Sequence, residues 1–165
     1  MSRRAQIQMS DAEVREFLAH ERVMTCATLG ARGWPHLMPL WFVTRPDAEG
    51  GERIWAWTYA ASQKVRNLER DPRATLQVEV GEQYDLLQGV MLECEVVIHR
   101  ELETVAELGR EILARIAAPR GEPPAAELPA DAAAMVQAQA AKRVGLEFAE
   151  RRRTSWDHRK LAGVY

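Results

Sequence analysis

The fold is decided by one stretch, Ile54-Trp55-Ala56-Trp57-Thr58-Tyr59-Ala60-Ala61-Ser62-Gln63-Lys64-Val65-Arg66-Asn67-Leu68. Its first half is rich in aromatic residues and includes a threonine, types that fit the pleated surface of a β-strand. After two alanines the pattern changes. Val65 and Leu68 recur at helical spacing, and Ser62 stands at the N-cap position that serine favours. The stretch therefore predicts a strand that leads directly into a helix.

The start of this helix brings together groups that bind anions. Free backbone N–H groups, the Ser62 hydroxyl and the Lys64 ammonium are expected at one point. Helix N-termini that carry such groups hold phosphates and carboxylates. An ordinary capped surface helix with a solvated, largely exposed lysine explains the same residues. Both interpretations stay open on this evidence alone.

Composition limits the class of protein. The chain has 165 residues and a formal net charge of −2, which argues against a general nucleic-acid binder. No stretch approaches the ~20 apolar residues of a membrane span, and the N-terminus lacks a signal-peptide core. Cys26 and Cys94 have no partner at metal-ligand spacing, so we expect buried thiols in a reducing compartment and no metal. One cytoplasmic domain over residues 1–165 is expected, with neither nucleic acid nor a membrane as partner.

The rest of the chain continues the alternation of strands and helices. A capping box at Ser10 and Glu13 precedes a short helix, and Gly30 and Gly33 punctuate a hairpin turn. A proline-rich loop lies between residues 119 and 129. The apolar periodicity predicts strands at residues 22–29, 36–44, 54–59, 74–80, 86–100 and from 144 onward, and helices at 101–117 and 130–141. An aromatic and basic tail, residues 156–165, closes the chain.

The second and third strands are apolar on both faces, so both faces need cover. A barrel whose outer side meets helices or a second subunit provides that cover. Pro39 cannot donate to a ladder, which predicts an edge or a bulge there. Trp34, Trp41, Trp55 and Trp57 exceed what a small barrel can hold inside. Some of them are therefore expected at a dimer interface and in a ligand cleft.

Four groups of residues follow one another in a characteristic order: Ser62-Gln63-Lys64, Asn67-Leu68, Arg70-Asp71-Pro72-Arg73 and Ser155-Trp156-Asp157-His158-Arg159-Lys160-Leu161. Together they resemble the pyridoxamine-phosphate-oxidase-like split β-barrel family, over about residues 10–163. Through Gln63 and the tail at 142–161 the chain is more narrowly similar to the deazaflavin (coenzyme F420)-dependent reductases. The resemblance implies a mainly β fold with helices (α+β), a split barrel of about six antiparallel strands of the FMN-binding type. It also implies a homodimer with cofactor sites between subunits, for coenzyme F420 or alternatively FMN.

The same resemblance implies a set of cofactor-binding residues. Ser62 and Lys64 match the family's phosphate-binding S-x-K, with Gln63 in place of a basic residue. The family's strand that contacts the cofactor ring is matched by Leu37, Met38 and Pro39, and its aromatic–threonine pair before the phosphate site is matched by Trp57 and Thr58. Gln88 matches a polar position near the cofactor. Trp156 and Arg159 resemble cofactor contacts of the family's tail. Phe42 stands where true oxidases carry a substrate-binding lysine, so we do not expect oxidation of vitamin B6.

The sequence offers no hydrolytic machinery, because it contains no HExxH, GxGxxG, Ser/His/Asp order or clustered carboxylate pair. In a flavin-type enzyme the cofactor carries the hydride. We therefore expect hydride transfer between coenzyme F420 and a small planar or conjugated substrate, in a cleft walled by Met38, Trp41, Trp57 and Tyr59. His36 is a candidate proton donor or a plain strand-end histidine, and the sequence identifies no catalytic residue.

Three alternatives remain at this stage. The protein is an FMN-dependent oxidoreductase of the same family, a non-catalytic flavin or haem carrier or sensor, or a purely structural dimer whose Lys64 site is empty. Cofactor binding and cofactor reoxidation distinguish them.

Overall fold

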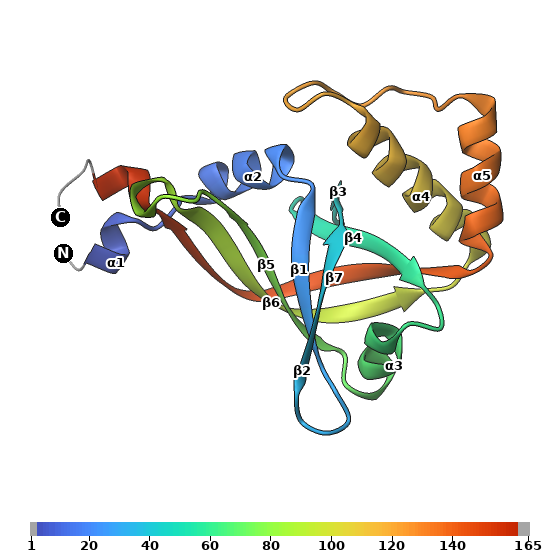
Figure 1. The fold of residues 1–165 in the computed structure, drawn as a ribbon, viewed down its shortest axis with the longest axis horizontal. Coiled ribbons are helices and arrows are strands. Elements are labelled where there is room, and N and C mark those ends of the chain that lie inside the picture. The colour runs from blue at the N-terminus through green and yellow to red at the C-terminus, as the bar shows by residue number, and fades with distance from the viewer. Residues whose placement is uncertain (1–2, 162–165) are drawn as a thin grey trace.

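A curled antiparallel sheet forms the body of the molecule (Figure 1). The structure is a computed structural model that describes residues 3–161, so residues 162–165 of the predicted tail lie outside it. Within residues 3–161 the sheet has seven strands in the order β2-β1-β5-β6-β7-β4-β3. They are β1 (Val23–Leu29), β2 (Pro35–Trp41), β3 (Val43–Pro46), β4 (Glu52–Tyr59), β5 (Arg73–Val80), β6 (Gln88–His99) and β7 (Arg143–Asp157).

The two edge strands of the sheet follow each other directly in the chain. β2 and β3 are the two edge strands, yet only Phe42 separates them in the chain. Its N–H donates to the Arg22 carbonyl at 3.2 Å, and its ring is fully buried. The two edges therefore meet at Phe42, which gives a split barrel as predicted. The predicted strand 36–44 divides here into β2 and β3, so the described sheet has seven strands where about six were predicted. Pro39 lies on an edge strand, as its missing N–H requires.

Alternate residues of the strands fill the barrel. The main core includes Met24 and Cys26 of β1, Leu76 of β5, and Leu92 and Cys94 of β6. Both cysteines are free and buried, and burial raises the pKa of each thiol to about 12. This agrees with the expectation of small hydrophobic residues.

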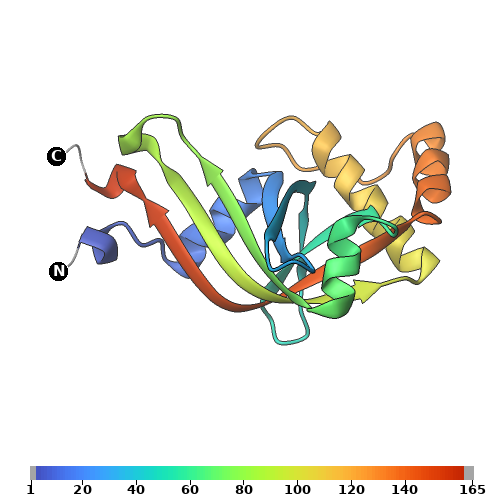
Figure 2. The ribbon, with the colours of Figure 1, turned by 60° about the horizontal axis from the view of Figure 1, so that its bottom comes forward.

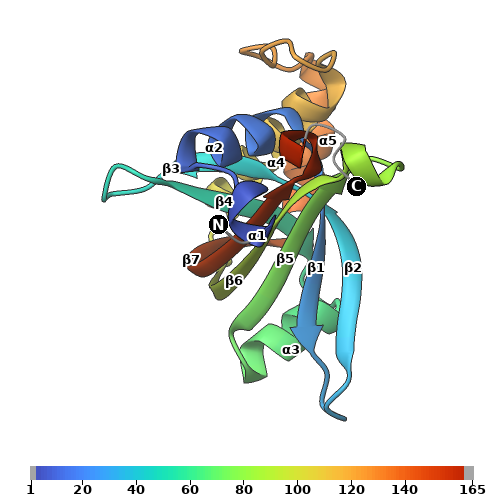
Figure 3. The ribbon, with the colours of Figure 1, turned by 90° about the vertical axis from the view of Figure 1, so that its left-hand side faces the viewer.

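Helices cover the ends and one outer side of the barrel. They are α1 (Arg3–Gln6), α2 (Asp11–His20), α3 (Gln63–Arg70), α4 (Leu102–Ala117) and α5 (Ala130–Ala140), with short 3-10 helices at Tyr84–Leu86 and His158–Leu161. α2 begins at the predicted capping box, in which Ser10 N–H donates to Glu13 and Glu13 N–H donates to Ser10. Figure 3 shows α2 and α3 at opposite ends of β1. No helix among residues 3–161 is both long enough and apolar enough to cross a membrane.

α4 and α5 pack as a pair beside the N-terminal end of β7 (Figure 2). Trp55 and Trp57, on the outer face of β4, pack against α4 residues such as Leu108. A Cβ atom at Gly109 would lie 2.5 Å from Cζ3 of Trp57. The close approach of α4 to β4 therefore needs glycine at this position.

Candidate functional site

The predicted junction of strand and helix is present at Ser62. β4 ends at Tyr59, whose carbonyl accepts the Ser62 N–H at 3.0 Å, and α3 begins at Gln63. Ser62 has the extended backbone of an N-cap, with φ −72° and ψ 155°, but its side chain makes no capping hydrogen bond. Its Oγ is buried without a partner. An unsatisfied buried hydroxyl costs about 1–3 kcal/mol, so a ligand that bonds to it would stabilise the site.

Lys64 points into the barrel and is only 6 % exposed. The prediction of a largely exposed lysine is therefore wrong. Its Nζ donates to Thr58 Oγ1 at 3.0 Å, and burial lowers the pKa of its ammonium. Within residues 3–161 no carboxylate forms an ion pair with it. A buried cation without an anionic partner is costly, and a bound phosphate would compensate it.

A chain of side-chain amides fixes α3 against β1. Gln63 Nε2 donates to Asn67 Oδ1 at 2.9 Å, and the fully buried Asn67 donates to Thr28 Oγ1 at 3.0 Å. The Arg70 guanidinium also donates to the Leu29 carbonyl. These contacts explain why Lys64 faces inward. Asn67 and Arg70 fix α3 against the end of β1. In this orientation the first turn of the helix directs Lys64 into the barrel.

His36 adds a second unsatisfied polar atom near α3. It lies directly opposite Thr28 in the β1–β2 ladder, on the same face of the sheet, and its Nδ1 is buried without a partner. Met38 lies opposite Cys26 in the same way. The inner face of β2 thus brings His36 and Met38 to the side of the barrel that α3 closes.

Leu37 and Pro39 face the other way. They alternate with His36 and Met38 along β2, and Leu37 is 56 % exposed. Their side chains therefore point away from Lys64. Contact with a ring through their backbone, as the resemblance implies, stays a prediction.

Thr58 and Trp57 also lie on opposite faces of one strand. Thr58 is inside the barrel with Lys64, whereas Trp57 packs under α4. The Arg143 guanidinium carbon stacks 4.4 Å from the Trp57 ring and 4.1 Å from the Tyr59 ring. For a single chain, the predicted cleft walled by Met38, Trp41, Trp57 and Tyr59 is therefore wrong. The alternation of strands separates Met38 from the two β4 aromatics, and helices cover Trp57.

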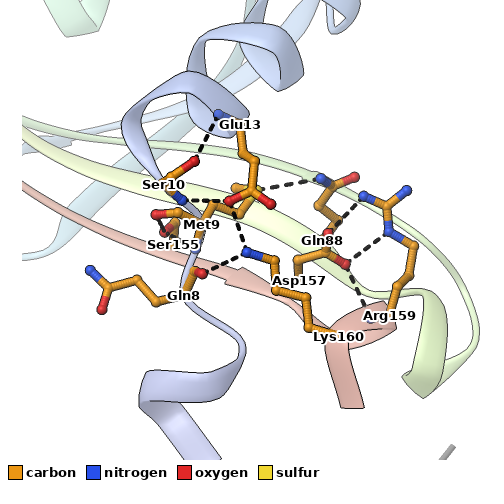
Figure 4. Close-up of polar contacts among 9 residues, drawn as sticks. All are labelled: Gln8, Met9, Ser10, Glu13, Gln88, Ser155, Asp157, Arg159 and Lys160. Carbon is orange, nitrogen blue, oxygen red and sulfur yellow. Dashed lines mark hydrogen bonds and ion pairs between the residues drawn. The ribbon is translucent and has the colours of Figure 1, made fainter. Parts of the chain in front are cut away.

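Gln88 and Trp156 form a separate group. They lie where β6 begins and β7 ends, with Gly89 paired to Trp156. A Cβ atom at Gly89 would lie 2.4 Å from Cζ2 of Trp156, so the indole packs directly on the glycine. Gln88 Nε2 lies 3.3 Å from the Met9 sulfur (Figure 4). Figure 1 shows this end of the sheet on the side opposite α3.

Polar contacts tie the N-terminal segment to the tail around this group (Figure 4). Arg159 holds Asp157 through two bonds of 2.8 and 2.7 Å and keeps the pKa of that carboxyl low. Lys160 donates to Glu13 at 2.8 Å and lowers the pKa of Glu13 to about 2. The tail is therefore a structural clamp in one chain. The contact of Glu13 with Lys160 and the stacking of Arg143 on Trp57 were not predicted, because both join residues far apart in the sequence.

Comparison with known proteins agrees with this fold. The family model described as Pyridoxamine 5'-phosphate oxidase matches residues 10–145. The crystal structure of the conserved hypothetical protein Rv2991 from Mycobacterium tuberculosis has a TM-score of 0.83 and 37% sequence identity, and the alignment covers 100% of this chain and 95% of that one. No curated protein matches.

Two more distant structures show the fold alone. One is an F420 reductase, with a TM-score of 0.60, 19% identity, and coverage of 84% of this chain and 94% of that one. The other is HutZ, described as the heme storage protein from Vibrio cholerae, with a TM-score of 0.60, 16% identity, and coverage of 86% and 90%.

Proposed function

The chain belongs to the pyridoxamine 5'-phosphate oxidase family, and from that premise we propose that it is an oxidoreductase that binds coenzyme F420. The observation that carries this proposal is the buried Lys64 ammonium, which has no anionic partner among the described residues and stands two positions after Ser62, whose hydroxyl is unsatisfied. FMN and coenzyme F420 both carry a phosphate. The residues present therefore fit the cofactors of this family.

Each group at the junction has a part in binding. Backbone N–H groups of the first turn of α3, the Ser62 hydroxyl and the Lys64 ammonium would hold the phosphate. Thr58 orients Lys64 through its hydrogen bond, and Asn67 fixes the helix on which Lys64 stands. When bound, the cofactor supplies hydride transfer. The chain's own residues bind it, orient it and exclude water from the barrel end.

Coenzyme F420 is favoured over FMN for two reasons. Gln63 replaces a basic residue of the family's phosphate motif, and an F420 reductase is among the structures that share the fold. FMN remains the alternative cofactor. For the substrate we propose a small planar or conjugated molecule. β2 has no Lys, Arg, Asp or Glu between Pro35 and Trp41, so apolar contact would hold the substrate.

A homodimer is part of the same proposal. The outer side of β1 and β2 exposes Val23, Leu29, Leu37 and Trp41, with Trp41 53 % exposed. Contiguous apolar surface of this kind favours a protein partner. In the proposed dimer, the end of one subunit that carries Gln88 and Trp156 would contribute to the cofactor site at α3 of the other. The buried free thiols support a reducing compartment, and we propose the cytoplasm.

Titration with each cofactor tests the binding site. Ser62→Ala removes a hydroxyl that makes no hydrogen bond, so the fold should be unaffected while affinity falls about 5- to 10-fold. Arg66→Ala is the matched control, because Arg66 is exposed on the same helix. Fluorescence quenching of coenzyme F420 and of FMN measures both variants. Equal affinity of Ser62→Ala and the parent protein for both cofactors would place the phosphate elsewhere.

Turnover needs its own assay. The protein is mixed anaerobically with reduced coenzyme F420 and a panel of quinones and conjugated enones, and cofactor reoxidation is followed by absorbance. Reoxidation faster than the protein-free rate supports an enzyme. If no acceptor accelerates it, with reduced FMN tested in parallel, the chain is a carrier.

Haem carriage is the second candidate, because HutZ shares the fold and is described as a heme storage protein. The unpartnered Nδ1 of His36 offers an imidazole nitrogen for it. Titration with hemin tests this function. A stoichiometric Soret band that His36→Ala abolishes would favour haem over a flavin-type cofactor.

A further inference from the structure

A cavity of about 630 Å³ lies away from the α3 site. It is lined by the C-terminal end of α2, by β3, by α4 and by the loop at residues 121–128. Figure 1 shows these elements along the top of the molecule, with α3 at the bottom. The volume falls within the range of small-molecule sites. Its apolar lining comes from Val43, Ala114, Pro123, Pro124 and Leu128.

Among the described residues, two arginines of the cavity wall direct their hydrogen bonds to backbone carbonyls, and one of them, Arg115, also stacks on the Phe42 ring. Arg22 donates to Ile116 O at 3.0 Å and to Ala118 O at 2.6 Å. Arg115 donates to the carbonyls at the end of α2, with 2.6 Å to Leu18 O. Carbonyl groups satisfy the hydrogen bonds but supply no full negative charge. Burial lowers the pKa of Arg115 and the nearby charge of Arg22 lowers it further, while the carboxylates of Glu21 and Glu52 oppose the shift. The wall therefore holds two guanidinium groups close together.

Arg110 is a third arginine of the lining, half-buried on α4. Among the described residues no hydrogen bond or ion pair is found for its side chain, in contrast to Arg45 nearby. Arg45 binds Glu111 through two bonds of 2.8 and 2.9 Å, which neutralises that carboxylate of the lining. The other carboxylates, Glu107 and Glu122, are exposed to solvent. His20 is also in the lining, with Nδ1 bonded to the Glu16 carbonyl.

From this charge balance we infer that the cavity binds an amphipathic organic carboxylate. Its carboxylate pairs with Arg110, on a wall that also carries Arg115 and Arg22. Its apolar body lies against Val43, Ala114 and the prolines of the loop. Charge-assisted hydrogen bonds to arginine favour a carboxylate over an uncharged molecule of the same shape. This site is independent of the cofactor site proposed at α3.

Calorimetric titration with decanoate tests the site, with decanol as the uncharged probe of the same length. Saturable 1:1 binding of decanoate is expected, with decanol at least about 10-fold weaker because it cannot form the ion pair. Arg110→Gln should weaken decanoate binding about 10-fold and leave the fold intact, because no hydrogen bond or ion pair of this side chain is found within residues 3–161. Arg120→Gln, an exposed arginine beside the same loop but outside the lining, is the matched control and should bind as the parent does.

A second variant fills the space. Ala125→Trp places a large side chain from the loop into the cavity and should abolish decanoate binding. Coenzyme F420 and FMN titrations of all variants should match the parent, which separates this site from the one at α3. The inference is overturned if decanoate does not bind saturably, if decanol binds as tightly, or if Arg110→Gln behaves like Arg120→Gln.

Discussion

Replacing Lys64 by methionine should change stability and cofactor binding in opposite directions. Methionine has nearly the same length and volume, so the barrel interior stays filled. The change removes an ammonium that is 6 % exposed and has no carboxylate partner among the described residues. It also removes the hydrogen bond of 3.0 Å to Thr58. The cofactor-free protein and the complex therefore lose different interactions.

The magnitudes follow from these two losses. The hydrogen bond contributes about 1 kcal/mol to the free energy of unfolding. Desolvation of a buried ammonium opposes folding by several kcal/mol even after relaxation. Lys64→Met should thus raise the free energy of unfolding of the cofactor-free protein by about 1 kcal/mol or more, which raises Tm by roughly 2–4 °C for a chain of this size. Loss of the charge-assisted bond to phosphate should weaken cofactor binding about 10- to 100-fold.

The pH dependence gives a second signature. The pKa of Lys64 is lowered in the folded protein, so the unfolded chain binds more protons between the folded pKa and the ordinary value of 10.5. Stability should rise with pH through that window in the parent protein, and this contribution should vanish in Lys64→Met.

Thermal unfolding followed by circular dichroism measures the stability, and fluorescence titration with coenzyme F420 and FMN measures the binding. Arg66→Met, on the exposed side of α3, should change neither quantity. A cofactor-free Lys64→Met that melts several degrees below the parent, with unchanged affinity for both cofactors, would refute the reasoning. Lys64 would then serve the fold and not a ligand.

Three further predictions concern packing, titration and assembly. Gly109→Ala should lower the free energy of unfolding by about 1–3 kcal/mol in urea titration, because its Cβ would meet Trp57 at 2.5 Å; an unchanged midpoint would contradict this packing. Burial raises the pKa of Cys26 and Cys94 from 9.0 to about 12, so both thiols contribute fully to stability below pH 9. Between pH 9 and 12 the free energy of unfolding should fall by about 1 kcal/mol per pH unit for each thiol. In Cys26→Ala this fall should be less steep than in the parent protein. The parent protein should have the mass of a dimer by light scattering at micromolar concentration, and Leu37→Asp should shift it toward the monomer; a monomeric parent would exclude the proposed interface.

Local features of the fold could be predicted from the sequence because neighbouring residues determine them. The capping box at Ser10, the change from strand to helix at Ser62 and the edge position of Pro39 each depend on a few adjacent residues, and the structure confirms all three. The division of the second strand at Phe42 was missed, since it depends on how the curled sheet brings its two edges together.

The environment of the site residues depends on contacts that are distant in the chain. Lys64 faces inward because Asn67 binds Thr28, 39 positions away, and no local pattern reveals that contact. The stacking of Arg143 on Trp57 is equally remote. The separation of Trp57 from Thr58 was different, because strict alternation along a strand already puts neighbours on opposite faces. The same rule applies to the predicted cofactor contacts, because Trp57 and Thr58 cannot both direct their side chains into the barrel.

Both proposed sites contain a buried or half-buried cationic side chain without a carboxylate partner among the described residues. Where arginines serve the fold at the surface, they are paired, as Arg159 is with Asp157 and Arg153 with Glu150. Lys64 inside the barrel and Arg110 in the upper cavity have no such carboxylate among the described residues, although burial makes an uncompensated charge more costly there than at the surface. A counter-charge that the chain does not supply has to come from solvent or from a ligand. The two sites differ in what surrounds the charge. At α3 a helix N-terminus and a hydroxyl suit a phosphate, whereas in the cavity an apolar lining suits a carboxylate with an apolar body.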